Sequence, residues 1–216
     1  LVLPLFIVGG TDLKQPVVSM PNISRMSIDK IVELAIEAYS LGIPAVALFP
    51  CVDESLKDSH ASEAINPDGL LQRTVRELKH AEPGIVVITD VAMDPYSSDG
   101  HDGLLVDGRI VNDDSIRILC EMALAQAQAG SDVVAPSDMM DGRVGFIRET
   151  LDDAGFTDVG ILAYSAKYAS SFYGPFRDAL SSAPKLGNKK TYQMDPSNRK
   201  EALREVSLDI DQGADM

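Results

Sequence analysis

The sequence predicts an α/β fold: a (β/α)8 TIM barrel, of which residues 1–216 hold roughly the first six β/α units. Short apolar runs alternate with amphipathic stretches, and buried strands that alternate with helices are typical of a parallel sheet. Polar side chains gather directly after successive runs, where a barrel builds its active site. No GxGxxG or Walker loop follows the first run, which disfavours a nucleotide-binding open sheet. We therefore expect one incomplete barrel domain over residues 1–216.

The predicted strands are short runs rich in β-branched and apolar residues, such as IPAVALFP, IVVITDV, DVVAP and ILAYS. Runs of this length bounded by Gly, Pro and Asp read as buried strands. The six runs begin near Leu3, Pro44, Ile85, Asp132, Gly160 and Thr191.

The predicted helices lie between these runs and carry apolar residues at a period near 3.6. The groups are Ile31/Leu34/Ala35/Ala38, Leu71/Val75/Leu78, Ile116/Leu119/Ala123, Val144/Ile147/Leu151 and Leu203/Val206/Ile210. Glycines suited to left-handed caps follow several of them, namely Gly42, Gly130, Gly155 and Gly213.

Composition narrows the class of partner and the compartment. The net charge of −14 disfavours nucleic acid and anionic membrane as partners. The opening LVLPLFIV is too short to cross a bilayer and has no basic region before it. Cys51 and Cys120 form no CxxC pair, so free thiols in a reducing, cytoplasmic compartment are expected. The absence of an initiator Met and the abrupt end at GADM indicate a chain cut at both ends.

The segment YSAKYASSFYGPFRDAL surrounds Lys167 with aromatic and small residues and places Arg177 ten residues later. A free lysine amine has a pKa of about 10.4 and is almost wholly protonated at neutral pH. Apolar burial or a nearby cation lowers the pKa of such an amine and prepares it to form a Schiff base with a ketone. The alternative is an exposed lysine that opens an ordinary helix, and spacing alone leaves both open.

Other polar residues follow the strands that precede this segment. Asp90 lies at the end of IVVITDV and Asp94 just after it, and Ser137 and Asp138 come after DVVAP. The carboxyl ends of barrel strands meet at one face, so these side chains are candidates for the same site. An Asp at the end of a strand is also a common cap or turn residue, which is the alternative for each of them.

Several segments together resemble the porphobilinogen synthase (5-aminolevulinate dehydratase) family, from about Val2 to Met216. They are YSAKYASSFYGPFRDA, VAPSDMMDGR, ITDVAMDPYSSDGHDG, IPAVALFP, NPDGL, KKTYQMDP and QGADM. The resemblance implies a barrel with an N-terminal arm and a lyase that condenses two molecules of 5-aminolevulinate into porphobilinogen, with loss of water, through lysine Schiff bases. It also implies a homo-octamer.

The resemblance implies a role for each candidate. Lys167 matches the Schiff-base lysine and Arg177 an arginine that holds the substrate carboxylate, for which a planar guanidinium fork is suited. Lys189 stands where many relatives have a second such arginine; the alternative is a solvated loop lysine. Residues 167–190 would form a lid that excludes water, with plain packing as the alternative for its aromatics. The full set of substrate-binding candidates is Arg177, Lys189, Asp90, Ser137, Tyr173, Phe176 and Gln193.

The metal expectation depends on the segment DVAMDPYSSDGHDG. The zinc-dependent branch of the family has three cysteines there, whereas this chain has Ala92, Asp94 and Asp102. Carboxylates suit Mg²⁺ rather than Zn²⁺, so the resemblance implies the magnesium-responsive branch without a catalytic zinc. Asp94 and Asp102 either attract a hard cation or solvate the loop. Glu205 matches a glutamate that binds an allosteric Mg²⁺ at a subunit interface, with a solvated helix face as the alternative.

Two other functions fit parts of the sequence. A class I aldolase-like enzyme would share Lys167 but not the whole YSAKYASSFYGPFRDA context. A catalytically inactive fragment or pseudoenzyme would keep only structural or assembly roles. The resemblance places a second Schiff-base lysine just beyond Met216, so residues 1–216 alone are expected to be inactive.

Overall fold

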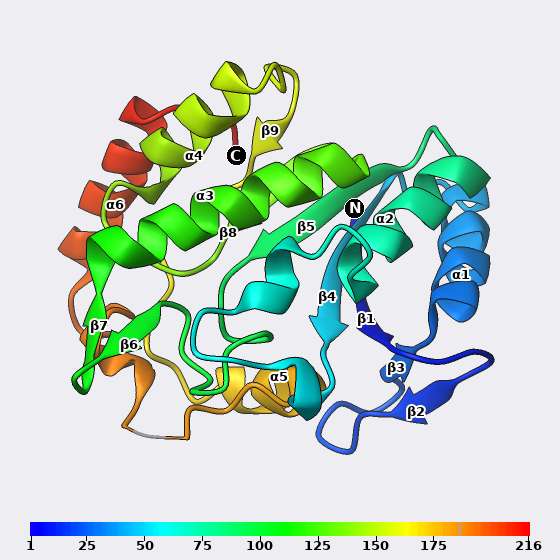
Figure 1. Ribbon diagram of the computed structural model, residues 1–216, viewed down its shortest axis with the longest axis horizontal. Coiled ribbons are helices and arrows are strands. Elements are labelled where there is room, and N and C mark those ends of the chain that lie inside the picture. The colour runs from blue at the N-terminus through cyan, green and yellow to red at the C-terminus, as the bar shows by residue number, and fades with distance from the viewer. Residues whose placement is uncertain (186) are drawn as a thin grey trace.

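The computed structural model describes residues 1–185 and 187–216, which form a mostly parallel sheet with helices between its strands (Figure 1). The successive parallel strands are β1 (Val2–Val8), β4 (Ala45–Cys51), β5 (Val86–Val91), β8 (Val133–Pro136) and β9 (Gly160–Ile161). The helices are α1 (Ile28–Ser40), α2 (Leu70–Ala81), α3 (Asn112–Ala129), α4 (Arg143–Asp153), α5 (Tyr173–Leu180) and α6 (Arg199–Asp211). Two short hairpins, β2 (Lys14–Pro16) with β3 (Ser24–Met26) and β6 (Leu104–Val106) with β7 (Arg109–Val111), and the 3-10 turns η1 (Glu54–Leu56), η2 (Ser62–Ile65) and η3 (Lys189–Thr191) complete the elements.

The strand order is β2-β3-β1-β4-β5-β8-β9. Each of the five parallel strands, β1, β4, β5, β8 and β9, pairs with the one that follows it in this series, which is the order of successive β/α units in a barrel. The α/β barrel prediction is confirmed for this part of the fold.

The sixth predicted strand, near Thr191, is wrong. Residues Lys189–Thr191 form the 3-10 turn η3, in which the Asn188 side chain accepts a hydrogen bond from Lys190 N. The run KKTYQM holds little β-branched surface to bury between neighbours. Pairing beside β9 comes instead from the last two residues, because Asp215 N donates to Ile161 O and Ala163 N donates to Met216 O, each at 2.9 Å.

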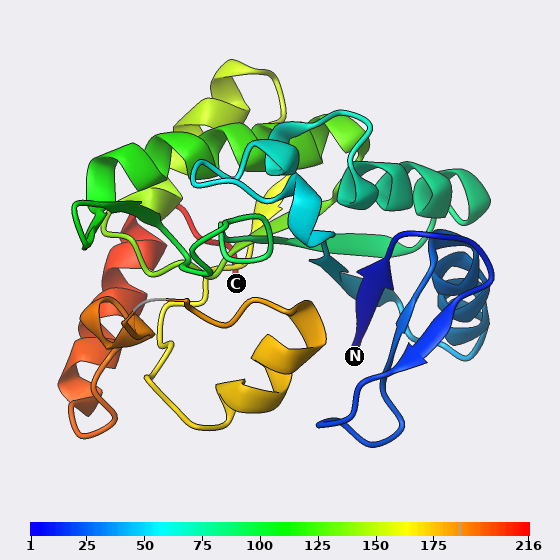
Figure 2. The same ribbon diagram turned by 60° about the horizontal axis from the view of Figure 1, so that its bottom comes forward.

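The two faces of the parallel strands bury different residues because successive side chains alternate. The outward residues pack beneath α1 and α2 and beneath α3 and α4. The inward face carries a smaller cluster, Ala45, Ile88, Val133 and Ala135. Helix α5, gold in Figure 2, lies across the sheet from α3, drawn in green. Its Ala179 and Leu180 pack on Phe6 and Phe49 of the inward face.

Five predicted helical groups lie in helices, namely α1, α2, α3, α4 and α6. The four predicted cap glycines all have positive φ, for example +106° at Gly130, where α3 ends. Helix α6 buries a polar residue. Leu203 and Ile210 are exposed, whereas Asp209 is buried and pairs with Arg143 of α4.

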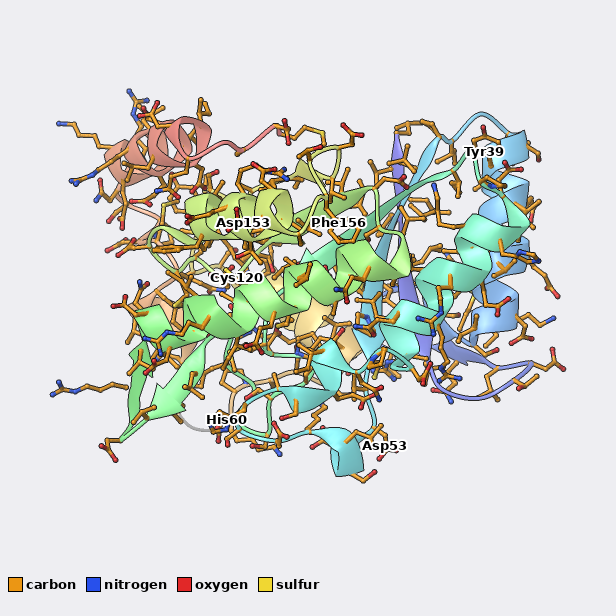
Figure 3. All side chains as sticks on the ribbon, turned by 45° about the horizontal axis from the view of Figure 1, so that its top comes forward. Tyr39, Asp53, His60, Cys120, Asp153 and Phe156 are labelled. Atoms are coloured by element: carbon orange, nitrogen blue, oxygen red, sulfur yellow. The ribbon has the colours of Figure 1, made fainter. Side chains whose placement is uncertain are left out.

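Both cysteines are free thiols, as expected. Cys120 lies on α3 near α4 (Figure 3) and packs against the core beneath these helices. Within the described residues, no helix is long and apolar enough to cross a membrane.

Candidate active site

The carboxyl ends of the parallel strands open into a cavity of about 380 Å³ beneath α5. Asp90 enters it from the end of β5, opposite Ala135 of β8, and Ser137 enters just after β8. The loop after β9 brings in Lys167. The other predicted residues that line the cavity are Asp94, Tyr173, Phe176, Arg177, Lys189 and Gln193. Fold topology therefore gathers candidates that are up to about a hundred residues apart in the chain.

Lys167 lies in the loop between β9 and α5, with only 11% of its side chain exposed. Its Nζ donates to Ser137 O at 2.5 Å and lies 3.5 Å from Asp102 Oδ2. The same nitrogen is 5.7 Å from the centroid of the Tyr173 ring. The alternative of an exposed lysine at the start of a helix is wrong, because α5 begins six residues later, at Tyr173.

Asp90 is the cavity carboxyl best suited to proton transfer. Burial raises the pKa of Asp90 to about 7, although Lys167 draws it down and the Ser137 hydroxyl, which donates to the carboxylate, does so as well. An acid whose pKa lies near the working pH can both give and take a proton. The alternative of a simple turn residue does not account for a buried carboxyl beside an amine.

A buried polar network that sequence reasoning missed fixes the backbone of Asp90. Gln126 Nε2, on α3, donates to Asp90 O at 2.8 Å, and its Oε1 accepts from Thr89 Oγ1 at 2.8 Å. Ser131 Oγ lies 2.7 Å from the same threonine hydroxyl. The available signal was an amide on the buried face of the run MALAQAQA, because a buried amide needs hydrogen-bond partners.

Lys189 is buried, with 4% of its side chain exposed, so the alternative of a solvated loop lysine is wrong. Its Nζ donates to Asp102 Oδ1 at 2.6 Å and to Asp94 Oδ2 at 3.1 Å. Burial lowers the pKa of Lys189, but the two carboxylates outweigh that effect and hold the pKa above its ordinary value. Lys189 therefore stays charged.

The two carboxylates respond oppositely to this environment. Burial raises the pKa of Asp94 above its ordinary value, even though Lys189 opposes the rise. Burial also acts to raise the pKa of Asp102, but Lys167 and Lys189 together hold it below the ordinary value. The described residues contain no group of three or more His, Cys, Asp or Glu placed to hold a metal ion. A cation at Asp94 and Asp102 stays a prediction, and here lysine ammonium groups occupy both carboxylates.

Tyr192, which was not predicted from the sequence, contacts the loop that carries Asp102. Its hydroxyl accepts a hydrogen bond from Asp102 N at 3.2 Å and lies 3.1 Å from His101 Nδ1. His101 is buried, with 3% exposure. These contacts hold the loop that carries Asp102 against the segment that carries Lys189.

Helix α5 supplies Arg177 and the aromatic wall of the cavity. The Phe176 ring meets the Phe49 ring edge-on, with centroids 5.1 Å apart, and also lines the cavity. Phe176 therefore both packs in the core and lines the cavity. Arg177 is half-buried, and no carboxylate among the described residues lies within ion-pair distance of its guanidinium. Arg177 is thus a cavity cation whose charge, among the described residues, is open to an anionic ligand.

Glu205 lies apart from this cavity, in a cleft of about 800 Å³ between α4 and α6. Asp141, Glu201 and Asp209 border the same cleft. Burial, followed by the charges of these three carboxylates, raises the pKa of Glu205. The alternative of a solvated helix face therefore describes Glu205 incompletely.

Comparison with known proteins gives one consistent family. A family model described as Delta-aminolevulinic acid dehydratase matches residues 1–216. The delta-aminolevulinic acid dehydratase of Bradyrhizobium diazoefficiens is 55% identical over 217 residues, covering 100% of this chain and 62% of the relative. The chloroplastic enzyme of Chlamydomonas reinhardtii is 52% identical over 225 residues, covering 100% of this chain and 58% of the relative.

A solved structure agrees with these relatives. It is the delta-aminolevulinic acid dehydratase (porphobilinogen synthase) of Toxoplasma gondii in complex with the reaction product porphobilinogen. The TM-score is 0.97 at 54% identity, covering 100% of this chain and 62% of that chain. This chain spans about three fifths of the length of these relatives.

Proposed function

The chain belongs to the delta-aminolevulinic acid dehydratase family, and we propose that the whole protein is a porphobilinogen synthase. In this proposal the protein condenses two molecules of 5-aminolevulinate into porphobilinogen, with loss of water, in tetrapyrrole biosynthesis. The observation that carries the proposal is the nearly buried Lys167 amine, which shares a cavity with a carboxyl whose pKa is about 7.

Lys167 and Asp90 have complementary roles in the proposed chemistry. Asp90, as the carboxylate, takes one proton from the Lys167 ammonium. The Nζ lone pair then forms a C–N bond to the ketone carbon of 5-aminolevulinate, the carbonyl π electrons go to oxygen, and one Nζ proton transfers to that oxygen to give a neutral carbinolamine. The hydroxyl leaves as water with the proton that Asp90 holds, while the nitrogen lone pair forms the C=N bond and leaves a protonated Schiff base with one N–H. A group with a pKa of about 7 suits both proton uptake and proton delivery.

Arg177 is the proposed partner of the substrate carboxylate because its charge is not already paired within the described residues. Its planar fork matches two carboxylate oxygens. Lys189 adds positive charge nearby, but its ammonium already donates to Asp94 and Asp102. We therefore assign the main carboxylate contact to Arg177 and a secondary one to Lys189. Tyr173, Phe176 and Gln193 line the cavity and exclude water from the imine.

The test of this function uses the whole protein, including the residues that its relatives have beyond this chain. We expect 5-aminolevulinate to be converted into a pyrrole, detected by colour reaction and mass spectrometry. A class I aldolase would instead cleave sugar phosphates, and a pseudoenzyme would convert neither. Either of those results would overturn the proposal.

We also propose that the active site needs no zinc and that Mg²⁺ binds at Glu205. The positions that would supply zinc thiolates hold Ala92, Asp94 and Asp102, and both carboxylates bond Lys189, so these residues do not fit Zn²⁺. The Glu205 cleft offers carboxylate oxygens, which suit Mg²⁺. Too few ligands converge there for a dehydrated ion, so a largely hydrated Mg²⁺ fits the cleft best.

Thermal melting of the whole protein tests the metal proposal. Millimolar Mg²⁺ should raise the melting temperature, because a ligand of the folded state stabilises it. Glu205→Gln should remove that rise, whereas Glu121→Gln, an exposed position on α3, should keep it. A zinc-selective chelator should leave the melting temperature unchanged. A rise with Mg²⁺ that survives Glu205→Gln would place the ion elsewhere.

Assembly and location complete the proposal. We propose a homo-octamer in the cytoplasm, on the resemblance to the family and on the two free thiols. The net charge of −14 supports a small-molecule substrate rather than nucleic acid or an anionic membrane.

A further inference from the structure

The carboxyl end of α5 is capped by two cations from distant parts of the chain. The last carbonyl groups of a helix have no partner within the helix. Arg25, on β3, donates from Nε to Ala179 O at 2.6 Å and from Nη2 to Asp178 O. Lys57, just after η1, donates from Nζ to Ser181 O at 2.9 Å. Positive charge at this end of a helix is also favoured by the helix dipole.

A second set of contacts holds the same end of α5 against the β2–β3 hairpin. Ser19 Oγ donates to Asp178 Oδ2 at 2.5 Å. Val17, from the same hairpin, packs in one buried cluster with Ala179 and Leu180. The hairpin and α5 therefore meet through hydrogen bonds and apolar contact, although more than 150 residues separate them in the chain.

Arg177 directly precedes the two carbonyl groups that Arg25 binds. Its guanidinium reaches the cavity from the last turn of α5, so any shift of that turn displaces it. Arg25 itself does not line the cavity. Its planar guanidinium donates to two successive carbonyl oxygens at once. A lysine ammonium lacks this planar, two-pronged geometry.

We infer that Arg25 is a positioning residue for the substrate-carboxylate site: by capping α5 it fixes the place of Arg177. This inference rests on the proposed function, because it names the substrate group that responds. Loss of Arg25 should weaken recognition of the carboxylate while leaving Lys167, which is held by Ser137 and Asp102, able to form its Schiff base.

Hydrogen exchange of the substrate-free whole protein is the first test. Removing a charge-assisted hydrogen bond to a backbone carbonyl should raise local opening of the helix end by roughly tenfold. Arg25→Met should therefore speed exchange of the backbone amides of residues 177–181 by about tenfold, and Arg25→Lys by less. Arg117→Met, which removes only an exposed pair with Asp114 on α3, should leave these amides unchanged. Unchanged exchange in Arg25→Met would overturn the inference.

The second test separates the carboxylate from the ketone. The probes are 4-oxopentanoate, which has the keto acid skeleton, and its methyl ester, which lacks the charge. Each is trapped on Lys167 with borohydride, and the modified peptide is quantified by mass spectrometry. In Arg25→Met we expect the half-saturating concentration of the acid to rise about tenfold relative to the unsubstituted protein, with that of the ester nearly unchanged. In Arg25→Lys the half-saturating concentration of the acid should rise by less than in Arg25→Met. If Arg25→Met does not fold, Arg25→Lys takes its place in the test.

Two results would contradict the inference in distinguishable ways. An equal change for the acid and the ester would show that Arg25 supports the whole cavity rather than the carboxylate site, and would overturn the inference alone. If no adduct forms on Lys167 in the unsubstituted protein, the proposed function falls, and the inference falls with it.

Discussion

Lys167→Met in the whole protein should abolish conversion of 5-aminolevulinate while leaving the fold intact. The substitution removes the amine that would attack the ketone but keeps an unbranched stem of similar length. Lys167 lies in a loop, so no helix loses a favourable residue. Removing the nucleophile of an enzyme that works by covalent catalysis can cost on the order of 10⁶-fold in turnover. Circular dichroism should show native secondary structure in the variant.

Lys190→Met is the matched control, since Lys190 adjoins Lys189 but is exposed. It should retain nearly full turnover. Turnover close to normal in Lys167→Met would contradict the role assigned to this lysine. A variant that does not fold would show up as lost circular dichroism signal, and would be replaced by Lys167→Gln.

Asp90→Asn should lower kcat by about 10²–10⁴-fold, the range typical of a lost general acid or base. In the unsubstituted protein, activity should change with an apparent pKa of about 7, the value to which burial raises Asp90. That limb of the pH profile should be absent from the residual activity of the variant. Asp153→Asn, at the exposed end of α4 (Figure 3), is the control and should keep it.

The same substitution should stabilise the folded protein at alkaline pH. The folded-state pKa of Asp90 is raised, so between about pH 4 and pH 7 the native protein binds more protons than the unfolded chain. The free energy of unfolding therefore falls as pH rises through that window. Above about pH 7 the folded protein bears the full cost of burying the ionised Asp90 carboxylate. Asparagine removes the penalty, a gain of up to about 4 kcal/mol at pH 8, from about three pKa units at 1.36 kcal/mol each. If Asp90→Asn is less stable than the unsubstituted protein at pH 8, burial of the ionised Asp90 carboxylate does not destabilise the fold and this prediction is wrong.

The elements with strong local signals could be predicted from the sequence. The strands of the sheet and helices α1 to α4 have β-branched runs or 3.6-residue spacing that matches the residues they bury. The run at Thr191 gave a false strand because Lys189, its first residue, is buried in the 3-10 turn η3 against two carboxylates instead of pairing in a sheet. The burial of Asp209 on α6 could not be predicted because its partner, Arg143, lies 66 residues away in the chain.

The site divides in the same way. Lys167, Arg177 and Asp90 could be proposed from motifs and from their places after strands, and the cavity gathers them. Tyr192 and Arg25 could not, because each acts through a backbone group far away in sequence. For Gln126 the one signal was an amide on the buried face of a helix, which does not say what that amide binds. No local pattern marks an arginine in a three-residue strand as the cap of a helix more than 150 residues later.

The most direct measurement of the central claim is reductive trapping. The whole protein is incubated with 5-aminolevulinate and borohydride, digested, and mapped by mass spectrometry. The account predicts a secondary-amine adduct of the substrate on Lys167. The adduct should be missing when no substrate is added, and the corresponding peptide of Lys167→Met should carry none. A protein that forms porphobilinogen yet never carries an adduct on Lys167 would contradict it.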